Sequence, residues 1–180
     1  MADAKTSSLD TDRKTLLVYY EEEIMGEAYF DALAEHFEGE GEGGKLRLLA
    51  RVERAAAEAV EPLLRKHHLT ARGEAVLKSL GEAGVAAHRD YGWREFMAHM
   101  VARYPGYVDD FERLERLAPD ADLPALKLLT RHEVAAIEFA AGELAGEAGS
   151  TAPLHRYLEQ CMVWCGKGET RVRRSRGDSR

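Results

Sequence analysis

Four glutamates in this 180-residue chain occupy helical positions where apolar side chains are expected. With successive residues placed about 100° apart around a helix, Glu23 and Glu27 fall on one apolar stripe. That stripe contains Leu16, Tyr20, Phe30, Ala34 and Phe37. Glu53 falls in the apolar arc of the next long segment and Glu133 in that of the last one, with His132 on its flank. Each such carboxylate must be protonated, paired with a positive charge or bound to a cation, because burying it alone costs several kcal/mol.

The sequence leaves two partners open for these acids. The three stripes contain no basic side chain, so a counter-charge must come from the middle of the chain, where Arg103 and His99 are best placed. The other partner is a metal ion. Carboxylate oxygens and imidazole nitrogens suit iron and manganese, and facing helices of a bundle are where such sites are built. His132 is then either a hydrogen-bonded packing residue or a nitrogen ligand.

Helical periodicity extends over most of the chain, whereas alternating patterns typical of strands are almost absent. The expected helical segments cover residues 12–37, 45–68, 73–88, 93–104, 107–117 and 122–146, followed by a short closing helix. A glycine-rich loop at 39–44 separates the first two, Pro62 predicts a kink, and Asp122 is a candidate N-cap.

This pattern predicts an all-α fold, an antiparallel four-helix-type bundle with additional short helices. The length suits one domain, which we expect to span residues 12–165. The polar N-terminus, residues 1–11, and the arginine-rich tail, residues 166–180, are expected to be disordered.

At its core acids the chain resembles the ferritin-like di-iron carboxylate superfamily. That family takes one Glu from each of two helices and a Glu-x-x-His motif from each of two others. Glu23 or Glu27 matches the lone Glu of the first helix, and Glu53 and Glu133 match the acids of the second and last helices. The resemblance implies a ferritin-like bundle over residues 12–146 that binds iron or manganese through Glu23, Glu27, Glu53 and Glu133, with His132 as a nitrogen ligand. It implies a metal-dependent oxidoreductase or oxygenase at which dioxygen or peroxide reacts, with a small molecule or dioxygen as the partner.

The chain departs from the family motif at both expected histidines, since Ala56 and Ala136 stand three residues after Glu53 and Glu133. A single-metal site, a divergent centre and a scaffold without metal therefore all remain open. The alternative function is a metal-free helical module for ligand binding or protein interaction, with a buried acid–arginine network. The aromatic residues around the Pro105-Gly106 break are more typical of a core than of a substrate pocket, although interrupted helices often border sites.

Charge and composition exclude several other classes of protein. The net charge of −7 argues against a nucleic-acid-binding surface, and no apolar run is long enough to span a bilayer. Cys161 and Cys165 are interpreted as reduced thiols, so we expect a cytoplasmic protein. By analogy with similar folds, a homodimer is plausible.

Overall fold

The computed structural model describes the backbone of residues 2–37 and 41–175 and the side chains of residues 14–37 and 41–164. In this part of the chain the secondary structure is entirely helical. The helices in chain order are α1 (Ala2–Ala34), α2 (Glu42–Lys66), α3 (Glu74–Gly84), the short 3-10 helix η1 (Val85–Ala87), α4 (Trp93–Arg103), α5 (Pro105–Leu117), α6 (Leu123–Ala145) and α7 (Ala152–Ser175). An all-helical fold is thus confirmed.

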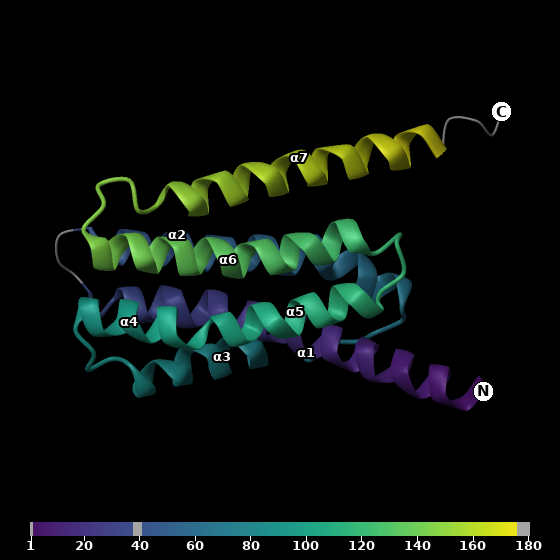
Figure 1. Cartoon of the computed structure of the whole chain (residues 1–180), viewed down its shortest axis with the longest axis horizontal. Coiled ribbons are helices and arrows are strands. Elements are labelled where there is room, and N and C mark those ends of the chain that lie inside the picture. Colours follow the sequence, from purple (N-terminus) through teal and green to yellow (C-terminus); the bar gives the residue numbers. More distant parts are fainter. Residues whose placement is uncertain (1, 38–40, 176–180) are drawn as a thin grey trace.

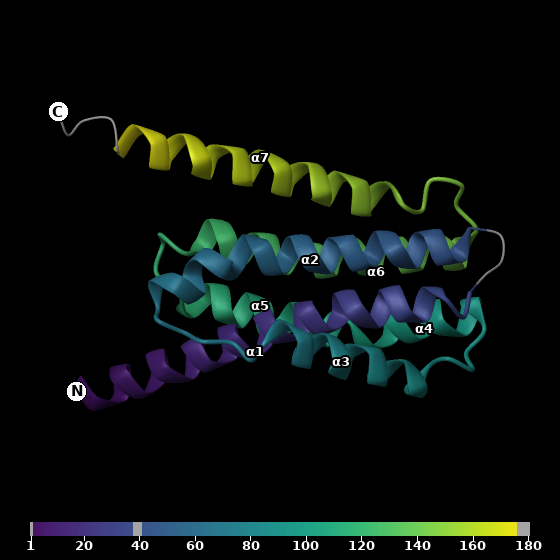
Figure 2. The ribbon, with the colours of Figure 1, turned by 180° about the vertical axis from the view of Figure 1, so that it is seen from behind.

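The helices pack in layers along a common long axis (Figures 1 and 2). Helices α1, α2 and α6 surround the core together with α4 and α5, which follow each other end to end. Helix α3 packs on the outer side of α1, and α7 packs over α2 and α6. None of the helices in the described residues combines the length and apolar character that a bilayer crossing requires.

The break between α4 and α5 occurs at Pro105. Proline has no backbone N–H to donate to the preceding turn, so a helix does not pass through it regularly. Pro105 instead takes a first-turn position of α5, where a missing donor costs little. The break places Tyr104 and Tyr107 on either side of it, in edge-to-face contact with their ring centroids 5.9 Å apart.

Helix α6 is anchored to its neighbours at both ends. At its start Asp122 is buried and pairs with Lys66 and with His67, whose Nε2 lies 2.8 Å from Oδ2 of Asp122. Near its end Glu143 accepts hydrogen bonds from Lys45 Nζ, at 2.7 Å, and from Trp93 Nε1, at 2.8 Å. These contacts tie α6 to α2 at both ends and to α4 at one.

Asp122 occupies the predicted N-cap position of α6, but its carboxylate makes no capping hydrogen bond. Its oxygens are taken by the two basic side chains at the end of α2. The C-terminal boundary behaves as expected: Gly146 adopts a left-handed conformation with φ of 73°, which glycine allows without strain.

Helices α1 and α3 approach closely because Gly81 has no side chain. A Cβ atom at this position would lie 2.1 Å from the backbone oxygen of Met25. Only glycine permits this separation, so α3 is held against the backbone of α1.

We expect Gly81→Ala to destabilise the fold by about 1 to 3 kcal/mol, because the methyl group forces the two helices apart. Gly84→Ala is the matched control in the same helix: its Cβ would meet only Tyr29, at an ordinary 3.5 Å. The higher helix propensity of alanine should make that control neutral or stabilising by up to about 1 kcal/mol. Chemical denaturation of both variants measures the difference, and equal stabilities would contradict the close approach.

Several predicted boundaries differ from the structure, and three of the helices show it most clearly. Helix α2 begins at Glu42, inside the glycine-rich loop expected at 39–44, of which residues 39 and 40 lie outside the described part. The closing helix α7 is 24 residues long, not short. Helix α1 begins at Ala2 and α7 ends at Ser175, but the side chains of residues 1–13 and 165–180 are outside the description, so disorder at the two ends stays a prediction.

Candidate metal centre

The buried face of α1 determines which of its acids enters the core. Residues Leu16, Tyr19, Glu23, Phe30, Leu33 and Phe37 are buried and follow one another at helical spacing. The helical position after Glu23 on this face is Gly26, three residues further on. Glu27 lies to one side, where it pairs with Arg54 of α2 and with Lys78 of α3. The structure therefore brings Glu23 into the core and leaves Glu27 in an ion-pair network between three helices.

Glu53 reaches the core from α2 through the space that Gly26 leaves open. A Cβ atom at Gly26 would lie 2.7 Å from Oε2 of Glu53 and 3.1 Å from its Cδ. The absence of a side chain at Gly26 thus gives the carboxylate of Glu53 its position beside Glu23.

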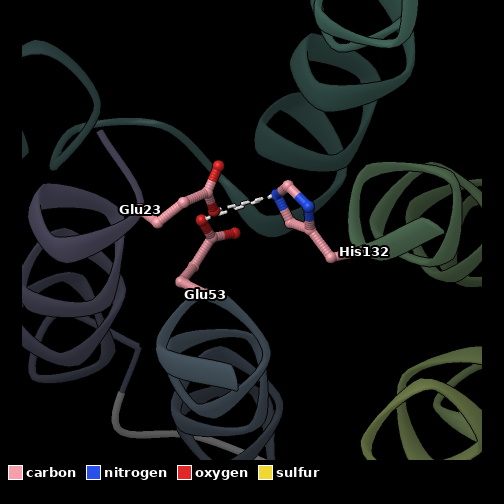
Figure 3. A group of neighbouring side chains, drawn as sticks. All are labelled: Glu23, Glu53 and His132. Carbon is pink, nitrogen blue, oxygen red and sulfur yellow. Dashed lines mark ion pairs between the residues drawn. The ribbon is translucent and has the colours of Figure 1, made fainter. Parts of the chain in front are cut away.

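His132 of α6 points toward Glu23 and Glu53 (Figure 3), and Glu133 of the same helix lies beside it. The Nε2 atom of His132 lies 3.0 Å from Oε2 of Glu23, 3.1 Å from Oε2 of Glu133 and 3.9 Å from Oε2 of Glu53. One imidazole nitrogen therefore faces three carboxylates from three helices. The four side chains, which we call the acid–histidine cluster, belong to residues only 1 to 7% exposed.

Two carboxylate oxygens of the cluster have no hydrogen-bond partner in the described part of the chain. They are Oε2 of Glu23 and Oε1 of Glu133, both fully buried. Although Oε2 of Glu23 is close to the imidazole, it does not meet the geometry of a hydrogen bond. Unpartnered buried oxygens are rare in native proteins, and an ion that takes them as ligands is one explanation.

The other ring nitrogen of His132 fixes the orientation of the imidazole. Nδ1 pairs with the backbone oxygen of Leu129, one turn earlier in α6. An N–H at Nδ1 that donates to this carbonyl directs Nε2 toward the carboxylates, which is the arrangement typical of histidines that bind metals.

The electrostatics of the cluster favour bound protons when no cation is present. Burial and the charge of Glu23 raise the pKa of Glu53 well above its ordinary value. Burial also raises the pKa of Glu133, against the opposing effect of His132. Burial alone would lower the pKa of His132, but the surrounding carboxylates, Glu23 foremost, raise it well above its ordinary value. A single imidazolium does not balance three carboxylates, so a proton or a cation must complete the site.

A cavity of about 300 Å³ adjoins the cluster. The four cluster residues line it together with aromatic side chains from α1 and from the α4–α5 break, namely Tyr29, Phe30, Tyr104, Tyr107 and Phe111. Leu80 and Tyr107, which are 45% and 43% exposed, also line it, so the cavity reaches the surface between α3 and α5.

The expected counter-charges from the middle of the chain do not reach the acids. Arg103 is exposed at the end of α4, and His99 stacks near His88 with their ring centroids 4.6 Å apart. The positive charge comes instead from His132, which the sequence places only on the flank of its helix. The prediction of Arg103 as the buried partner is wrong because Arg103 lies on the exposed side of the last turn of α4, whereas Met100 occupies the buried side.

Two residues of the site were missed by helical periodicity. Glu22, which lies outside the predicted apolar stripe of α1, is partly buried and lines the cavity. Burial, Glu23 and Glu133 raise the pKa of its carboxyl. Tyr104 was interpreted as core, yet it lines the cavity, and burial with the nearby Glu133 and Glu53 raises its pKa. Both positions depend on how α5 packs against α1, which no pattern within one helix reveals.

The class that the fold and site define is an all-helical protein with a buried acid–histidine cluster beside an aromatic cavity. Comparisons with family models, with curated proteins and with solved structures give no match to this chain.

Proposed function

We propose that the acid–histidine cluster binds iron or manganese and that the protein is a ferritin-like, metal-dependent oxidoreductase or oxygenase. In this proposal α1, α2, α6 and the α4–α5 pair correspond to the four helices of an antiparallel bundle. Glu23, Glu53, His132 and Glu133 are the ligands, and Glu27 is not among them.

The observation that carries the proposal is the convergence of oxygen and nitrogen donors with unpartnered atoms. One ligand atom from each of Glu23, Glu53 and His132 lies within 4.8 Å of the others, and Glu133 adds a buried oxygen that has no other partner among the described residues. A set of carboxylates with one imidazole suits iron and manganese better than softer ions.

The neighbouring cavity supports a reaction rather than metal storage. A metal at this position supplies a Lewis acid, or a redox centre, to a molecule held against it. The aromatic walls exclude water around the ligands, and the opening between α3 and α5 gives a small molecule access. A cytoplasmic location is part of the proposal.

The test is the metal content of protein purified without a metal-binding tag, followed by anaerobic reconstitution with iron or manganese. We expect about one or two ions per chain, as determined by elemental mass spectrometry. Glu53→Ala should lose at least about tenfold in metal affinity, because the cluster loses its only ligand from α2. Glu58→Ala, which removes an exposed acid of the same helix, should retain the metal of the wild type.

Metal retained in full by Glu53→Ala would contradict the ligand assignment. Protein that takes up neither ion would contradict the metalloprotein proposal altogether. The alternative would then be a metal-free ligand-binding module in which His132, and not Arg103, compensates the acids.

A further inference from the structure

The outer part of the cavity contains an acid that the metal proposal does not use. Glu22 lines the cavity beside Glu23 and is partly buried. Among the described residues it forms no ion pair and no hydrogen bond. Arg72 and Arg54 pair with Glu21 and Glu27 of α1 and not with Glu22. Arg103, whose charge acts on Tyr107, forms no ion pair with Glu22 among the described residues. Glu22 therefore presents a negative charge to whatever enters the cavity.

Aromatic rings complete the surroundings of this charge. Tyr104 and Tyr107 are nearly perpendicular, with an interplanar angle of 84°, and both line the cavity with Phe111. The face of an aromatic ring attracts a cation, and a carboxylate next to such rings is the usual composition of a site for an organic ammonium group.

The charge of the lining also selects against anions. Four carboxylates line the cavity, and His132 is the only basic side chain among the lining residues. A divalent ion bound to Nε2 of a neutral His132 balances two of the four negative charges. The cavity thus keeps a negative charge when metal is bound, and Glu22 has no ion-pair partner among the described residues in either state.

We propose that this cavity binds a small organic ammonium ion, with the ammonium group at Glu22 and the Tyr104–Tyr107 pair and an apolar body in the aromatic interior. Its volume of about 300 Å³ is at the lower end of the range for small-molecule sites and limits the body to roughly one ring. The inference does not require metal in the acid–histidine cluster.

Three probes of nearly equal size test the proposal on the metal-free, full-length protein at pH 7: benzylamine, benzyl alcohol and benzoate. Calorimetric titration should show benzylamine binding at least about tenfold more tightly than benzyl alcohol, and benzoate not binding. Glu22→Gln should remove the preference for the amine and leave the affinity for benzyl alcohol unchanged. Glu82→Gln, which removes an exposed acid of α3 outside the cavity, should behave as the wild type.

Equal affinities for the amine and the alcohol, tighter binding of benzoate, or no binding of any probe would overturn the proposal. So would a preference that persists in Glu22→Gln. Thermal unfolding of both variants verifies that they are folded. Repeating the titration with manganese present separates the two proposals, because amine binding without metal uptake contradicts only the metal centre, and metal uptake without amine binding contradicts only the ammonium site.

Discussion

Replacing His132 with leucine is expected to lower the free energy of unfolding of the metal-free protein by about 3 to 5 kcal/mol at pH 8. The imidazole lies within 3.9 Å of three buried carboxylates and is the only positive side chain in the cluster. Leucine fills a similar volume, so the loss comes from stranded negative charge and not from a void. For a chain of this length the change corresponds to a fall in Tm of roughly 6 to 20 °C.

Thermal and chemical unfolding of the variant measure this effect. His155→Leu, which changes an exposed histidine of α7, is the control and should alter stability by no more than about 0.5 kcal/mol. Adding Glu23→Gln to the His132 variant should recover part of the loss, because one fewer charge is stranded. A His132→Leu protein as stable as the wild type at pH 8 would show that the imidazole does not stabilise the buried carboxylates.

The metal-free protein should become less stable as the pH rises from 5.5 to 8.5. Burial raises the pKa of Glu53 and of Glu133 above the ordinary value of 4.5, and the carboxylates raise that of His132 above 6.5. All three groups hold protons in the folded state that the unfolded chain releases. The stabilisation from His132 is complete below its unfolded pKa and is lost as the pH rises through its folded one. Each extra proton held contributes up to about 1.4 kcal/mol per pH unit.

At acid pH the dependence is opposite, and the stability of the protein rises with pH. Lys66 and His67 overcome the effect of burial and lower the pKa of Asp122, and Lys45 does the same for Glu143. The stability from these ion pairs is present above the unfolded pKa of each acid and is lost as the pH falls through the folded one. The stability maximum should therefore lie near pH 5, between the two regimes.

Measuring Tm against pH with and without manganese tests the assignment of these protons. Metal binding displaces them, so affinity rises with pH and the metal-bound protein should lose the downward slope. Glu53→Gln should flatten the slope of the metal-free protein. A metal-free Tm that rises from pH 5.5 to 8.5 would contradict the burial of protonated acids.

Helical periodicity predicted the core acids because their placement depends on one helix at a time. Glu23, Glu53 and Glu133 lie on faces whose other members are apolar, and all three are buried. The same reasoning did not separate Glu23 from Glu27, which differ by one turn. The distinction comes from Gly26 and from Arg54 of the neighbouring helix, which takes Glu27 out of the core.

Features that depend on the packing of two or more helices could not be predicted from the sequence. Pro105 separates α4 from α5, and α5 packs beside α1. The cavity forms between these helices, with Glu22 and Tyr107 among its lining residues. The central place of His132 likewise depends on the rotation of α6 about its axis, which the ion pairs at its two ends help to set.

The rotation of α6 decides how close His132 and Glu133 lie to Glu23 and Glu53. His132 and Glu133 are consecutive residues, so their side chains leave α6 about 100° apart and reach the same centre from its two sides. Turning α6 either way would bring one of them closer to Glu23 and Glu53 and withdraw the other. The geometry of the acid–histidine cluster is therefore sensitive to torsion of a single helix. The ion pairs of Asp122 and Glu143, about 21 residues and roughly thirty ångströms apart along α6, hold the helix at both ends and so fix its rotation.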